Sequence, residues 1–176
     1  MDFNAKKSKI LLFSSKSKLP HYSLLGHELK ILEEVKYRGV VIQSDMKFTA
    51  HIHRKLMTAN QQLGIIKRAL YWAPTSAKLL AYKTLCLHHL EYAAGAWTPS
   101  SKKDISDIEQ LQDQAVQFIA GIKGRDGVED AKTRLGLIPL HKRRRDQRLR
   151  LLIIRILVKE ERHSSLYESD NEIMKQ

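Results

Sequence analysis

The stretch HIHRKLMTANQQLGIIKRAL, residues 51–70, decides the fold class of this chain. Its apolar residues recur at steps of four and three, which is the period of one helix face. They are Ile52, Leu56, Ala59, Leu63, Ile66 and Leu70. Gly64 interrupts the segment and costs a helix about 1 kcal/mol relative to alanine. The pattern therefore predicts a long amphipathic helix that buries one face against other helices.

The sequence after residue 70 predicts further helices. Pro74 ends the connection, Thr75 or Ser76 can cap the next helix, and that helix runs over about 76–90. This second helix is apolar almost all round, which is typical of a helix in the middle of a bundle.

The later helices have clear boundaries. Ser101 and Asp104 have the spacing of a capping box, and Gly121 is placed to end the helix that follows. A short helix over 128–135 and a long final helix after Pro139 complete the predicted bundle.

The first 45 residues lack this helical pattern, and we expect them to form short strands with no obvious helical partner. The candidates are Lys9 to Ser15, Tyr22 to Leu25, Glu28 to Leu32 and Tyr37 to Gln43, with a loop at Lys16 to Pro20. We expect such hairpins to expose Leu11, Leu12, Val40 and Ile42. The predicted fold is α+β and mainly α. It comprises a β-hairpin segment (1–45), a helical domain of about four helices (46–163) and a flexible tail (164–176).

The composition favours a polyanionic partner. The 176 residues carry a formal net charge of +12, which points to nucleic acid, although a solvated basic surface or an acidic protein partner would also fit. The lone cysteine, Cys86, excludes an internal disulfide and fits an intracellular location. Leu151 to Val158 is the longest apolar stretch and is far too short to cross a bilayer, so we expect no membrane partner.

The final helix supplies the candidate binding surface. At about 100° per residue, its basic residues form one narrow stripe between two apolar faces. The basic stripe comprises His141, Arg144, Arg148, Arg155, Lys159 and Arg162, with Arg145 at its edge. The apolar faces are Leu149, Leu152, Ile153 and Ile156 on one side, and Leu151, Ile154 and Val158 on the other. Such a stripe can follow a phosphate backbone without reading bases, or it can simply be solvated. Arg54, Gln61 and Arg68 repeat the pattern weakly on the first helix.

No catalytic or metal constellation is recognisable. The eight histidines lack the spacing of a zinc site, no Gly-x-Ser-x-Gly elbow is present, and no Asp-Asp pair could hold two metal ions. We therefore expect neither a metal nor another cofactor, and no enzymatic activity from the chain on its own.

An ordered series of motifs resembles the part of non-LTR (LINE-type) retrotransposon reverse transcriptases that follows the catalytic centre. The series comprises Asn4 to Phe13 (end of the palm), Tyr37-Arg38-Gly39-Val40 (primer grip), Phe48 to Leu70 (first thumb helix), Ala81 to Leu85 with Leu90 to Trp97 (second thumb helix and exit), and Leu111 to Ala115 with Arg143-Arg144-Arg145 (later landmarks). The resemblance implies an RNA-directed DNA polymerase segment that holds RNA, DNA or a hybrid. The Tyr-x-Asp-Asp strand, whose aspartates bind Mg²⁺ in this family, is absent.

Two further departures bear on the function. Arg38 stands where the primer grip usually has leucine, and His89 where proline often precedes Leu-Glu-Tyr. The leading hypothesis is residual, sequence-independent nucleic-acid binding by the basic stripe. The alternatives are a helical interaction module, in which Leu151, Ile154 and Val158 dock a partner helix or a second copy, and a non-functional transposon relic.

Overall fold

The computed structural model describes residues 4–13 and 21–173, without the side chains of Lys6 and of residues 159–173. The predicted loop at 16–20 and the end of the strand predicted at 9–15 lie outside these ranges. The fold is mainly helical with short N-terminal strands, so the predicted α+β class is confirmed.

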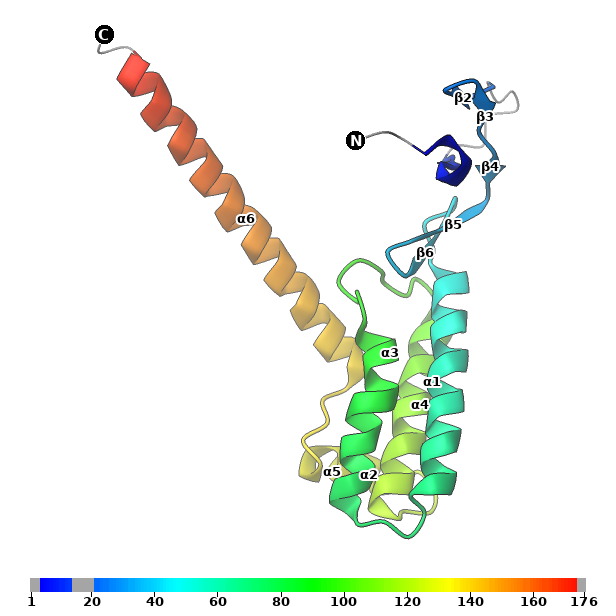
Figure 1. Ribbon diagram of the computed structural model, residues 1–176. Helices are drawn as coiled ribbons and strands as arrows, with labels where there is room; N and C mark the ends of the chain where they lie inside the picture. Colours follow the sequence, from blue (N-terminus) through cyan, green and yellow to red (C-terminus); the bar gives the residue numbers. More distant parts are fainter. Residues whose placement is uncertain (1–3, 14–20, 174–176) are drawn as a thin grey trace.

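The centre of the fold is a bundle of long helices. Helix α1 (Thr49–Ala69) covers the stretch quoted above, and α4 (Lys102–Ala120) lies beside it. In the chain between them, a continuous helical rod is built from α2 (Thr75–Ala81), a π-helical turn η2 (Tyr82–Leu87) and α3 (His88–Glu91), and it packs against both helices. Figure 1 shows these elements packed side by side, with the short α5 (Val128–Arg134) at the lower end of the bundle.

The core lies where the apolar faces of these helices meet. Ile52, Ala59, Leu63 and Ile66 of α1 are buried, as the spacing predicts. The other helices contribute Tyr82, Cys86, Leu87, Leu90, Ile108, Leu111, Ala115, Val116 and Ile119. One face of the rod is not covered by other helices, however. On this face Leu80 and Leu85 are 63% and 48% exposed. The prediction of a fully central second helix is therefore wrong on that face.

The helix ends agree with the sequence at two places and differ at one. Ser101 caps α4 by accepting a hydrogen bond from the Lys103 backbone N–H, and Gly121 ends α4 with a left-handed φ of 70°. The predicted capping box is formed only in its serine half, because Asp104 Oδ2 is buried without a hydrogen-bond partner among the described residues. The rod, in contrast, has Pro74 as its N-cap, with no side-chain cap, so neither Thr75 nor Ser76 caps it as predicted. Proline suits this position because it has no N–H to leave unpaired at the helix start, and its φ of −65° fits the extended N-cap conformation.

The N-terminal segment forms three small two-stranded sheets. After a 3-10 turn η1 (Ala5–Lys7), β1 (Ile10–Leu11) pairs in parallel with β4 (Ile31–Leu32). The antiparallel pair β2 (Ser23–Leu24) and β3 (His27–Glu28) is inserted between them. The third sheet is a hairpin of β5 (Glu34–Tyr37) and β6 (Val40–Gln43). The prediction of one strand over 37–43 is thus wrong, because the chain turns at Arg38 and Gly39.

The hairpin has a helical partner, contrary to expectation. Its second strand packs on α1, where the His51 ring accepts a hydrogen bond from the Val41 N–H at 3.1 Å, and the Gln43 side chain accepts one from the Ala50 N–H at 2.9 Å. Val40 is only 8% exposed and belongs to the same buried core as Ile52 of α1. The expectation that the hairpin exposes Val40 fails because α1 covers this side of the strand.

The last helix, α6 (Leu140–Ile173), starts at the bundle and then projects away from it (Figure 1). Its backbone is helical ten residues beyond the predicted domain end at residue 163. Flexibility of residues 164–176 stays a prediction.

Candidate nucleic-acid interface

The base of α6 is attached to the bundle by two carboxylates. Glu109 of α4 accepts hydrogen bonds from the backbone N–H groups of Leu140 (3.2 Å) and His141 (2.7 Å), and its carboxylate lies 3.1 Å from the His141 ring. A carboxylate at a helix N-terminus satisfies free N–H groups and complements the helix dipole. Glu91 of α3 pairs with the Arg143 guanidinium through two hydrogen bonds, and this pairing raises the pKa of Arg143. Together these contacts determine which face of α6 meets the bundle.

Arg144 is not part of an exposed stripe, so this prediction is wrong. The residue is 6% exposed, and its guanidinium carbon lies 5.2 Å from the ring centre of Trp97. Burial lowers the pKa of Arg144, and the carboxylates of Glu109 and Glu91 oppose this effect. Its Nε and Nη2 atoms have no hydrogen-bond partner among the described residues. The contacts of Glu91 and Glu109 rotate this side chain into the bundle, where it packs on an aromatic face and cannot reach a phosphate in solvent.

Three other members of the basic stripe do lie together. Arg145, Arg148 and Arg155 line one cleft at the place where α6 passes the loop that follows α3. The remaining lining comprises Gly95, Leu149, Leu151 and Leu152. We call this site the basic cleft. All three arginines are exposed, and Asp146, 3.6 Å from Arg145, is the one carboxylate paired with them among the described residues.

Gly95 lines the basic cleft beside Leu151 of α6. A Cβ atom at this position would clash with Cδ1 of Leu151, so the leucine side chain takes its place against the loop because residue 95 has no side chain. Leu151 belongs to the apolar face predicted to dock a partner helix, and the structure already uses it for a contact within the chain.

The remaining candidates of the stripe are accounted for separately. His141 is half exposed but engaged by Glu109. The side chains of Lys159 and Arg162 lie outside the described residues. Of the weaker series on α1, Arg54 forms an ion pair with Glu34 at 2.5 Å, while Gln61 and Arg68 are exposed.

The tetrapeptide Tyr37-Arg38-Gly39-Val40 forms the turn of the β5–β6 hairpin. Arg38 and Gly39 have φ values of 45° and 80°, the sign that two-residue hairpin turns require. The Arg38 carbonyl accepts a hydrogen bond from the Tyr92 hydroxyl at 2.9 Å, and the Tyr92 ring lies against Gly39. The Tyr37 ring is 60% exposed and the Arg38 guanidinium lies over it at 5.7 Å. The turn therefore rests on the loop that also provides Gly95.

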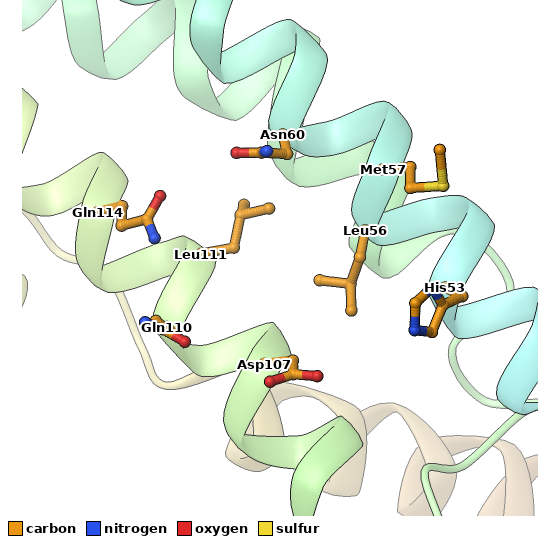
Figure 2. A pocket seen from close by; sticks show the side chains of 8 residues that line it. All are labelled: His53, Leu56, Met57, Asn60, Asp107, Gln110, Leu111 and Gln114. Atoms are coloured by element: carbon orange, nitrogen blue, oxygen red, sulfur yellow. The ribbon is translucent and has the colours of Figure 1, made fainter.

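A second hollow lies between α1 and α4. Figure 2 shows the side chains of the two helices facing each other across it. It is lined by His53, Leu56, Met57 and Asn60 from α1 and by Asp107, Gln110, Leu111 and Gln114 from α4. The lining is rich in amides and holds no lysine or arginine, so it lacks the charge that a phosphate backbone needs.

The described residues contain no group of three or more His, Cys, Asp or Glu placed to hold a metal ion. Burial raises the pKa of the Cys86 thiol to about 12, which keeps it protonated and unreactive. Within the same residues, no helix is long and apolar enough to span a bilayer.

Comparison of the chain with protein-family models, with curated proteins and with solved structures gave no match.

Sequence reasoning missed the residues that orient α6. Glu91, Trp97 and Glu109 lie 31 to 52 residues before their partners in the chain, and no local pattern connects them. For Gly95 the sequence held one weak indication of a functional position, because this residue lies in the Leu90 to Trp97 motif of the family resemblance.

Proposed function

We propose that the chain is the post-catalytic part of a non-LTR retrotransposon reverse transcriptase and that it binds nucleic acid without sequence preference. The observation that carries the binding proposal is the basic cleft, where Arg145, Arg148 and Arg155 converge beside Gly95. Exposed arginines beside a groove contact phosphates and position a strand without reading its bases. The net charge of +12 favours the same partner.

The family assignment is supported by motif order and by local structure. The primer-grip-like tetrapeptide occupies a hairpin turn, and the thumb-like segments occupy packed helices. Because the family's catalytic aspartates are absent from the chain, the proposed activity is binding and not polymerisation.

The test is binding of the full chain to a primer–template hybrid across a salt series. Each phosphate contact contributes about 0.7 to 0.9 to the slope of log K against log salt. Replacing Arg145, Arg148 and Arg155 together with alanine should reduce that slope by about 2 to 3.

The matched control removes three exposed cations near α5, Lys123, Arg125 and Arg134. This control should change the slope less than the cleft variant. Equal slopes for the two triple variants would contradict the assignment of the basic cleft.

A second candidate function is a helical interaction module, favoured by one observation. Residues 149–158 are all large and apolar except for Arg150 and Arg155. Each of the eight apolar residues is 47–56% exposed. Exposed apolar surface of this kind marks association sites.

Sedimentation at increasing protein concentration tests this alternative. Association that is lost in Ile154→Glu and kept in Leu80→Glu, an equally exposed site on α2, would favour it. A concentration-independent monomer would exclude self-association.

A further inference from the structure

The turn between α1 and α2 carries the most exposed large hydrophobic side chain among the described residues. Trp72 is 93% exposed, and its neighbour Tyr71 is 60% exposed. The two rings pack edge to face, with centroids 4.9 Å apart and planes at 87°. At 93% exposure, the ring of Trp72 is open to solvent apart from this contact.

The surrounding sequence is uniformly basic. Residues 46–90 contain no aspartate or glutamate, and their cations are Lys47, Arg54, Lys55, Lys67, Arg68, Lys78 and Lys83. Arg68, in the last turn of α1, is exposed, and its guanidinium lies back along the helix near Gly64. The backbone of Arg68 is therefore about one helical turn, or roughly 5 Å along the axis, before the aromatic pair, and its guanidinium lies about one further turn back along α1.

We propose that the α1–α2 turn is a second nucleic-acid contact, in which an unpaired base stacks on Trp72 and Arg68 holds a neighbouring phosphate. Open aromatic faces beside cations are what single-stranded nucleic acid requires, because every base has a π-face and every nucleotide a charge. A membrane surface is a less suitable partner for this turn. Thr75 and Ser76, which follow the aromatic pair, are polar and exposed, so the turn has little apolar area beyond the two rings to insert into lipid.

This contact is spatially separate from the basic cleft. The 21 residues of α1 span roughly 30 Å, and the turn lies at the opposite end of the bundle from the β5–β6 hairpin and the loop that holds Gly95 (Figure 1). The inference shares with the proposed function only the class of partner. A tetranucleotide has only three internucleotide steps and is shorter than the roughly 30 Å of α1, so one bound oligomer contacts one place at a time and quenching of Trp72 reports on the turn.

Intrinsic fluorescence of the full chain provides the first test. The chain has two tryptophans, and Trp97 is 1% exposed in the core, so it serves as an internal reference. A thymidine tetranucleotide should quench Trp72, and polyphosphate of equal charge should not. Equal quenching by both would overturn stacking. A blue shift with phosphatidylserine vesicles, without quenching by the oligomer, would overturn the proposal in favour of a membrane surface.

Affinity measured by anisotropy of a labelled tetranucleotide provides the second test. Trp72→Ala should weaken binding at least about fivefold, the lower end of what base stacking contributes. Leu80→Ala, which truncates another exposed side chain of the same helical pair, should leave affinity unchanged. Unchanged affinity in Trp72→Ala would refute the contact. The cleft variant should keep tetranucleotide binding, which separates failure of this inference from failure of the proposed function.

Discussion

Lowering the pH should destabilise the fold through one buried histidine. His51 is 1% exposed, and its Nδ1 accepts the Val41 N–H hydrogen bond, so Nε2 carries the proton of the neutral ring. Its ring edge also packs on Trp97, with centroids 5.1 Å apart. Burial, followed by the charges of Lys55 and Arg54, lowers the pKa of His51 from 6.5 to about 4. The folded state thus favours the neutral ring.

The sign and size of the effect follow from linkage. Between the unfolded and folded pKa values the unfolded chain binds the additional proton, so the free energy of unfolding falls as the pH falls below about 6.5. At about 1.4 kcal/mol per pKa unit, the loss should reach about 2 kcal/mol at pH 5 and about 3 kcal/mol below pH 4.

Urea denaturation of wild type and His51→Asn at several pH values between 7.5 and 4.5 measures this loss. Asparagine retains an oxygen acceptor for the Val41 N–H and does not titrate, so its stability should depend less on pH, whatever its absolute stability. His53→Asn is the matched control, because His53 is exposed and only two residues away. If wild type and His51→Asn lost equal stability between pH 7 and pH 5, the reasoning would be refuted.

Three further changes have defined outcomes. Gly39→Ala should lower the free energy of unfolding, measured by urea denaturation, by about 1–2 kcal/mol, because φ at residue 39 is 80° and the new Cβ would lie 3.1 Å from the Tyr92 ring. An unchanged free energy of unfolding would contradict this conformation of the turn. The Cys86 thiol, fully buried and with a pKa of about 12, should react with a thiol reagent only as fast as the chain unfolds; rapid reaction in native buffer would contradict its burial. Glu109→Gln should destabilise the chain by about 1 kcal/mol, since the N-terminus of α6 loses a negative charge. Glu33→Gln, at an exposed carboxylate without an ion pair among the described residues, is the comparison, and equal losses would argue against a specific role.

The predicted and observed structures agree where local periodicity decides the outcome. The 4-3 spacing of α1, the Ser101 cap and the Gly121 stop depend on residues within one or two turns, so they could be identified without tertiary information. The sequence did not predict the hairpin turn at Arg38 and Gly39, and residues 37–43 were expected to form one strand. The β-branched residues at 40–42 favour a strand more strongly than a single glycine favours a turn.

The candidate site was predicted only in part, for the same physical reason. Arg145, Arg148 and Arg155 were found because a helical period groups them on one side. Their cleft partner Gly95 comes from a loop about 50 residues earlier in the chain, and its proximity depends on how α6 is docked. Trp72 was passed over because sequence alone does not distinguish an exposed tryptophan from a core one; Trp97, the other tryptophan, is fully buried.

Local periodicity and composition are enough to predict that the chain is mainly helical, that its charge favours a polyanion, and that cations gather along its last helix. Which of those cations is exposed depends on how that helix packs against the bundle. Neighbouring residues on a helix point about 100° apart, so a rotation of α6 exchanges the places of Arg144 and Arg145. The ion pair with Glu91 and the cap from Glu109 set that rotation, and the result is one arginine buried on Trp97 and the next exposed in the basic cleft.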